Sequence, residues 1–340
     1  MIKLGEHSLN KEYESIQEEA SQSDLAYAMV FPGQGSQSVG MLSELAERYP
    51  EIKARFEMAS VILGYDLWAL AQQGPAEKLA DTRITQPLVF TANMALWDTW
   101  RQQIPEAPTL LAGHSLGEYS ALVASGVCDF ETGLKAVIAR ADAMVNASPE
   151  GEGGMLAVLG LSSDQLEAIC ASVTAQCGLM VGCVNYNAPA QTVIGGHKEA
   201  LKRVERDAKA AGAKRILPVA MSVPSHSPLM KPAAEQLSTY MCTVTFSAPT
   251  IPLLHNATLS SADNVAAIKS ALIEQVYQPV NWIALIEKIV AQGLTRIIEC
   301  GPGKVLTGLN RRINKQLVLC SLSSPATLDS AKELFAQTAH

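Results

Sequence analysis

The chain has 340 residues, of which 48% are hydrophobic and 5% aromatic, so it is long enough for a large globular domain with a substantial core. Its formal net charge of −7 argues against a nucleic-acid-binding protein, which needs a basic face for phosphates. The seven cysteines include no C-x-x-C pair, the N-terminus lacks the apolar core of a secretory signal, and no run of about 18 apolar residues is present. We therefore expect a cytoplasmic protein without disulfides, metal site or membrane contact.

The first 25 residues are polar and acidic, and we expect a tail outside the core, with at most a short surface helix. The apolar run 26–31 then stops at Pro32-Gly33, as a buried parallel strand does when it ends in a loop. Helical patterns follow at 41–63 and 85–103.

A second apolar run, 109–112, ends at the turn Gly113-His114-Ser115-Leu116-Gly117, and a helix is expected through 119–125. A strand, a glycine turn and a helix, repeated along the chain, are typical of a parallel α/β sheet. The same pattern returns at 296–300, which ends at Gly301-Pro302-Gly303.

The middle of the chain predicts a different unit, with the order β-α-β-β-α-β of a ferredoxin-like subdomain. Its expected elements are a strand at 154–161, a helix at 163–174, strands at 181–186 and 191–195, a helix at 197–211 and a strand at 214–223. We expect this unit, 149–221, to be inserted into a large α/β subdomain made of 26–148 and 222–320, with a tail or helix at 321–340.

The G-x-S-x-G pattern around Ser115 has a mechanical purpose. A sharp strand-to-helix turn with small flanking residues lifts a serine Oγ clear of the backbone and aims helix N-terminal amides at the place where an oxyanion forms. A glycine-rich turn without chemistry is the alternative, but the apolar strand before it and the helix after it favour a nucleophile.

A serine nucleophile needs a base, and the chain has only six histidines. Two lie in the tails, His114 adjoins the serine on the same turn, and His197 begins a predicted helix. His226, in a proline-bracketed loop, is the preferred base, and His255, at the end of another apolar run, is the alternative. Either could instead be a structural histidine.

The glycine loop Pro32-Gly33-Gln34-Gly35-Ser36-Gln37 lacks both the G-x-G-x-x-G spacing and the G-K-[ST] ending of nucleotide-binding loops. In elbow enzymes the second oxyanion donor comes from a loop after a neighbouring strand. The backbone amide of Gln34 is a candidate for that donor.

Together, the segments FPGQGSQ, GHSLGE and SVPSH closely resemble the malonyl-CoA:acyl carrier protein transacylases of bacterial fatty-acid synthesis and the related acyltransferases of polyketide synthases. The resemblance covers residues 26–320. It extends to the segments GYDLW, QQGPAE, GHKEA, AGAKR and GPGKVLTGL.

The resemblance implies that Ser115 is the nucleophile and His226 its base, with the amides of Leu116 and Gln34 as the oxyanion hole. It also implies that the backbone carbonyl of Gln275 orients the histidine. We find no compelling acid between serine and histidine, so the resemblance implies a Ser-His dyad in place of a triad.

Arg140 matches the arginine that binds the free malonyl carboxylate, and a guanidinium is suited to that role because its planar fork binds a carboxylate with two hydrogen bonds. An arginine in a surface ion pair is the alternative. The family often has glycine after this arginine, where this chain has Ala141.

The implied reaction is ping-pong transfer of malonyl from malonyl-CoA, through an ester on Ser115, to the phosphopantetheine thiol of an acyl carrier protein. The resemblance implies no cofactor, and we expect a monomer. Fatty-acid synthesis is the favoured pathway and polyketide synthesis the alternative. An acyl-thioester hydrolase or esterase with the same elbow, and a non-enzymatic descendant, are the competing classes.

Carrier proteins are acidic, and the basic residues that we expect to bind one are Lys214, Arg215, Arg311, Arg312 and Lys315.

Overall fold

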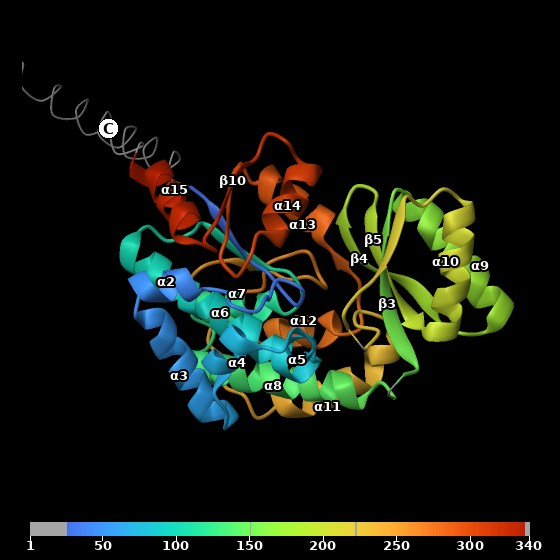
Figure 1. Ribbon diagram of the computed structural model, residues 1–340, viewed down its shortest axis with the longest axis horizontal. Helices are drawn as coiled ribbons and strands as arrows, with labels where there is room; N and C mark the ends of the chain where they lie inside the picture. Colours follow the sequence, from blue (N-terminus) through green and yellow to red (C-terminus); the bar gives the residue numbers. More distant parts are fainter. Residues whose placement is uncertain (1–25, 150, 222, 337–340) are drawn as a thin grey trace, which may run out of the picture.

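The computed structural model describes residues 26–149, 151–221 and 223–336, which form two sheets in neighbouring subdomains (Figure 1). The predicted tail at 1–25 lies outside the described residues. The larger sheet has the strand order β10-β9-β1-β2-β7, and all of its neighbouring strands are parallel. Its strands are β1 (Ala28–Phe31), β2 (Leu110–Gly113), β7 (Leu253–Leu254), β9 (Arg296–Glu299) and β10 (Val318–Ser321).

Both faces of the larger sheet are buried, because alternate residues of β1 enter two different clusters. Met29 and Phe31 pack with one group of helices, whereas Ala28 and Val30 pack with two others, α13 (Trp282–Ala291) and α14 (Val305–Ile313). A parallel sheet covered on both faces explains why its strands are continuous apolar runs.

The helices around this sheet are α2 (Ser43–Arg48), α3 (Glu51–Leu63), α4 (Leu67–Gln73), α5 (Ala76–Leu79), α6 (Thr82–Gln103), α7 (Gly117–Ala124), α8 (Phe130–Asn146), α11 (Lys231–Met241), α12 (Val265–Gln275), α13 (Trp282–Ala291), α14 (Val305–Ile313) and α15 (Pro325–Ala336). The single helix predicted at 41–63 is wrong, because α2 ends before Pro50 and α3 begins after it. Proline has no N–H to continue the helical ladder and restricts the residue before it.

The smaller sheet has the order β6-β3-β5-β4-β8. Its elements β3 (Gly153–Leu159), α9 (Ser163–Cys177), β4 (Val181–Ala188), β5 (Gln191–His197), α10 (Lys198–Ala210) and β6 (Arg215–Pro218) follow the predicted ferredoxin-like order. The pairs β3–β5, β3–β6 and β4–β5 are antiparallel. Helices α9 and α10 cover the outer face of this sheet (Figure 1).

Two features of the smaller sheet differ from the sequence prediction. The last strand, expected at 214–223, ends at Pro218, and the chain then turns tightly, with the Met221 N–H donating to the Val219 carbonyl. The strand β8 (Val280–Asn281) comes from beyond the predicted insertion and pairs in parallel with β4. The larger subdomain therefore contributes a strand to the smaller sheet.

None of the helices in the described ranges is both long and apolar enough to span a membrane.

Candidate functional site: a serine, a histidine and an arginine at the elbow

Ser115 lies at the sharp turn between β2 and α7. Its φ of 53° falls in the left-handed region, which is uncommon for a residue with a side chain. Gly117 allows the turn to pack closely, because a Cβ there would lie 2.0 Å from the Phe31 carbonyl oxygen at the end of β1. The strand and helix around the serine thus have the arrangement of a nucleophile elbow.

His226 points at the serine from the loop before α11. Its Nε2 lies 2.7 Å from Ser115 Oγ, and its Nδ1 lies 2.7 Å from the backbone carbonyl of Gln275 at the end of α12. A carbonyl can only accept, so Nδ1 carries the proton and Nε2 presents a lone pair to the serine hydroxyl. The His226 backbone is held in place by its own N–H, which donates to the Val276 carbonyl.

The surroundings of His226 keep its ring neutral. Burial, and then the positive charge of Arg140, lower the pKa of His226 from 6.5 to about 3, and the hydrogen bond to Gln275 opposes this shift. At neutral pH the imidazole is therefore in the form that can accept a proton.

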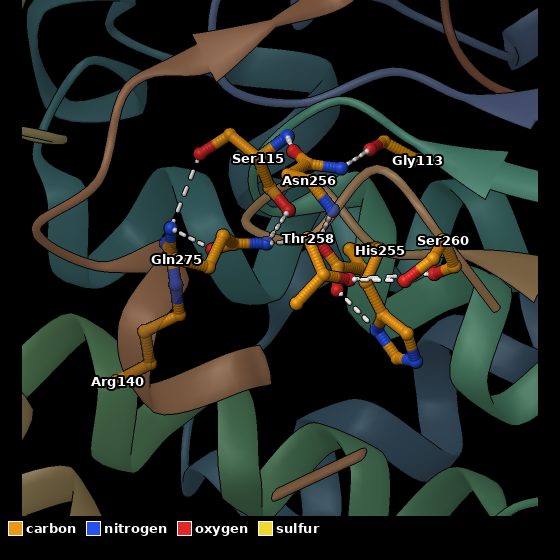
Figure 2. Close-up of polar contacts among 9 residues, drawn as sticks. Gly113, Ser115, Arg140, His255, Asn256, Thr258, Ser260 and Gln275 are labelled. Atoms are coloured by element: carbon orange, nitrogen blue, oxygen red, sulfur yellow. Dashed lines mark hydrogen bonds and ion pairs between the residues drawn. The ribbon is translucent and has the colours of Figure 1, made fainter. Parts of the chain in front are cut away.

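Arg140, on α8, brings a cation to the same serine oxygen. Its guanidinium is only 1% exposed, and Nη2 donates to Ser115 Oγ at 3.1 Å and to Gln275 Oε1 at 3.0 Å (Figure 2). Nη1 donates to Gln86 Oε1 at 2.8 Å. Within the described residues Arg140 forms no ion pair, its Nε has no partner, and its Nη atoms bind only neutral oxygens, so its positive charge can still attract an anion.

The two predicted oxyanion donors lie beside the serine. Gln34 and Leu116 line the same pocket as Ser115, and neither backbone amide donates a hydrogen bond to another group of the described chain. The Ser115 amide is already engaged, because it donates to Asn256 Oδ1 at 2.8 Å (Figure 2). Free amides at this point suit a developing oxyanion.

The pocket in front of Ser115 has a volume of about 210 Å³ and lies between the two subdomains. The larger subdomain lines it with Met144 and with His114 and the site residues described above, and the smaller one adds an apolar wall with two amides. Those additions are Met155, Ala157, Asn185, Asn187, Val193, Val219 and Met221. The neighbouring His114 donates from Nε2 to Asn187 Oδ1 at 2.8 Å on the pocket wall, so this ring nitrogen is not the base for Ser115.

His255, the alternative base, does not reach the serine. It is fully buried, and its Nδ1 contacts Glu118 Oε1 at 2.7 Å. Asn256 beside it was missed by the sequence analysis, although its side chain binds both Ser115 and Gly113. Glu118 was missed too, despite lying within the GHSLGE segment.

Three of the basic residues proposed for carrier binding gather at one end of the smaller sheet. Leu159 of β3 pairs with Arg215 on one side and with Gln191 on the other, and Arg312 of α14 donates to Gln191. Lys214 precedes Arg215, and all three basic residues are exposed.

Comparison with known proteins places residues 28–322 in one family. The model of the acyl transferase domain matches residues 28–322. Malonyl CoA-acyl carrier protein transacylase of Salmonella typhimurium is 51% identical over 305 residues, which cover 90% of this chain and 98% of the relative. The transacylase of the same name from Escherichia coli K12 is 49% identical over 308 residues, which cover 91% of this chain and 99% of the relative.

Solved structures agree with the sequence relatives. A malonyl-transacylase in complex with a type II polyketide synthase acyl-carrier protein has a TM-score of 0.88 at 46% identity, covering 91% of this chain and 99% of its own. An acyl carrier protein S-malonyltransferase from Vibrio cholerae has a TM-score of 0.85 at 48% identity, covering 90% and 99%. The chain therefore belongs to the acyl transferase domain family and, within it, to the malonyl CoA-acyl carrier protein transacylases.

Proposed function

We propose that this enzyme transfers the malonyl group from malonyl-CoA to the phosphopantetheine thiol of an acyl carrier protein, for fatty-acid synthesis. The observation that carries the proposal is the convergence of two groups, an imidazole and a guanidinium, on the hydroxyl oxygen of Ser115. Ser115 Oγ lies 2.7 Å from a neutral imidazole nitrogen and 3.1 Å from a buried guanidinium nitrogen. A nucleophile, a base and a carboxylate-binding cation are what transfer of a malonyl group needs.

In the first half-reaction His226 Nε2 accepts the Ser115 hydroxyl proton as Oγ attacks the thioester carbon. The amides of Gln34 and Leu116 stabilise the oxyanion, and collapse of the tetrahedral intermediate breaks the C–S bond. His226 returns the proton to the departing CoA sulfur. Arg140 holds the malonyl carboxylate throughout.

In the second half-reaction the carrier thiol gives its proton to His226 and attacks the malonyl ester. The C–O bond to Ser115 breaks, and His226 returns the proton to Oγ. The Gln275 carbonyl orients the imidazole in both halves and stabilises the imidazolium that forms. No cofactor takes part, and the seven free cysteines fit the reducing cytoplasm in which we place the enzyme.

Mass spectrometry of the intact protein after mixing with malonyl-CoA tests the proposal. We expect a persistent malonyl adduct that Ser115→Ala abolishes and that an acyl carrier protein discharges. Rapid release of free malonate without an adduct would instead support the hydrolase.

The same measurement with Arg140→Ala tests whether Arg140 binds the malonyl carboxylate. Truncating one partner of a buried charge pair costs about 2–5 kcal/mol, so malonyl loading is expected to fall by roughly 30-fold or more relative to acetyl loading. An unchanged preference for malonyl-CoA over acetyl-CoA would contradict the role of Arg140.

A further inference from the structure

A buried carboxylate lies behind the acyl-transfer site, and none of the steps above uses it. Glu118, the second residue of α7, is fully buried and accepts three hydrogen bonds. The donors are His255 Nδ1 at 2.7 Å, Gln275 Nε2 at 2.7 Å and the Asn256 backbone N–H at 3.1 Å. A charged group buried with this many partners costs free energy to desolvate, so its presence calls for an explanation.

The first connection runs through the side chain of Gln275 to the substrate-binding arginine. Gln275 Nε2 donates to Glu118 Oε2 and to the Ser115 carbonyl, at 2.7 and 2.9 Å, while Oε1 accepts from Arg140 Nη2 at 3.0 Å. A carboxylate and a carbonyl can only accept, so they hold the NH₂ of this amide on their own side. The amide oxygen must then face Arg140, and a reversed amide would place donors against donors.

The same connection brings a negative charge near the arginine without a direct ion pair. Burial lowers the pKa of Arg140, and Tyr119 and then the negative charge of Glu118 oppose that shift. A direct ion pair between the two would take up guanidinium donors that a substrate carboxylate needs. With one neutral amide in between, Arg140 donates a single hydrogen bond to Gln275 and no carboxylate of the described chain contacts the guanidinium.

The second connection runs to the elbow itself. The Asn256 side chain accepts from the Ser115 N–H at 2.8 Å and donates to the Gly113 carbonyl at 2.7 Å, and its backbone N–H donates to Glu118 (Figure 2). Asn256 therefore bridges the first and third residues of a turn in which Ser115 has a positive φ.

We propose that Glu118 is a positioning residue for malonyl selectivity. Its Oε2 accepts from the side-chain amide of Gln275, which orients the amide oxygen toward Arg140, and from the backbone N–H of Asn256, which bridges the elbow. His255 binds the other carboxylate oxygen, Oε1. The inference deepens the proposed function and rests on it. Glu118 touches no reacting atom, so it acts through Arg140 and Ser115.

The experiment compares Glu118→Gln with wild type in single-turnover loading from malonyl-CoA and from acetyl-CoA. Glu118→Gln keeps the shape but removes the charge, and its NH₂ would face the N–H donor of either Gln275 or His255, so one of the two hydrogen bonds is lost. We expect malonyl kcat/KM to fall by about tenfold relative to acetyl kcat/KM, the effect of losing one hydrogen bond to a charged group, mainly through a higher KM for malonyl-CoA. Glu47→Gln, at an exposed position on α2, is the matched control and should change neither substrate.

An equal loss for both substrates would overturn the proposal, because a merely structural role does not distinguish malonyl from acetyl. If Glu118→Gln does not fold, the pair His255→Leu and His255→Asn decides. His255→Leu removes the donor to Glu118 and should lower the malonyl preference, whereas His255→Asn replaces the Nδ1–H donor and should restore it. Failure of Asn to restore the preference contradicts the proposal. Failure of the wild-type protein to form a Ser115 adduct would instead contradict the proposed function itself.

Discussion

At the residue scale, the site depends on a histidine whose charge is controlled by its neighbours. His226 is 2% exposed, and burial and Arg140 both disfavour its protonated form. In the proposed mechanism a malonyl carboxylate bound to Arg140 would offset one of these two influences. We therefore expect the base to take the serine proton most readily when malonyl-CoA is bound.

The low pKa of His226 predicts an unusual pH profile for loading. A base with the ordinary pKa of 6.5 would be about nine-tenths protonated at about pH 5.5, and kcat/KM would drop about tenfold. Because the pKa of His226 is lowered to about 3, we expect kcat/KM for malonyl-CoA to stay nearly constant from about pH 7.5 to 5.5. A pH series of adduct formation measures this, and an inflection near 6.5 would count against it.

The same shift has a consequence for stability, with a definite sign. Between 6.5 and about 3 the unfolded chain binds a proton at His226 that the folded chain does not, so stability falls as pH drops through this window. Urea unfolding should show a weaker dependence on pH in His226→Gln than in wild type.

The residues that sequence reasoning found are those with a local signal. Ser115 stands in a motif between a strand and a helix, and His226 remained after the other histidines were weighed. Arg140 and Gln275 needed the family resemblance, because nothing local marks an arginine on a helix or a main-chain carbonyl as functional. Glu118 and Asn256 were missed because their roles come from contacts between positions more than 130 residues apart.

At the element scale, the elbow depends on how closely α7 approaches β1. A Cβ on Gly117 would meet the Phe31 carbonyl oxygen at 2.0 Å, and one on Gly113 would meet the Gly117 carbonyl carbon at 2.0 Å. Backbone atoms cannot yield as a flexible side chain can. The two glycines of the motif are thus required for packing as much as for the turn.

We expect Gly117→Ala to destabilise the fold by about 1–3 kcal/mol, as overpacking of a core does, and to slow adduct formation because the serine is displaced. Gly308→Ala is the matched control, since Gly308 also lies in a helix, α14, but has no atom within 4 Å of an added Cβ. The control should be neutral or stabilising by about 0.5–1 kcal/mol. Urea unfolding of both variants measures the difference, and equal behaviour would refute the packing argument.

The fold was predictable where elements repeat a strong local pattern. The buried strands around β1, β2 and β9 and the β-α-β-β-α-β order were evident from apolar runs and turn residues. The two-residue strands β7 and β8 were not, because their pairing is decided by tertiary contacts and two residues carry no periodicity. The break at Pro50 was missed because the apolar spacing continues through it.

At the scale of the whole molecule, the pocket and the basic residues both lie where the two subdomains meet. The smaller subdomain supplies the apolar wall of the pocket, and α14 of the larger one reaches Gln191 through Arg312. The rest of the molecule carries a net negative charge, so a local basic cluster stands out as a surface for an acidic partner.

Charge reversal at this cluster should affect the second half-reaction. We expect Arg215→Glu combined with Arg312→Glu to slow transfer from the malonyl-enzyme to an acyl carrier protein by about tenfold or more at low salt, with a smaller effect at high salt. Rapid-quench measurement of adduct discharge gives the rate. Arg206→Glu, at an exposed position on α10, is the control, and a double variant that discharges at the wild-type rate would exclude this surface from docking.

The strand β8 limits how the smaller subdomain can be exchanged between relatives. A chimera that exchanges 149–221 alone would leave β4 beside a β8 from the other parent, and β8 begins five residues after Gln275, whose carbonyl binds His226. A poorly matched pairing of β4 with β8 would disturb catalysis even if both subdomains folded well. An exchange of the smaller subdomain that keeps activity therefore has to include two separate segments, residues 149–221 and the strand Val280–Asn281.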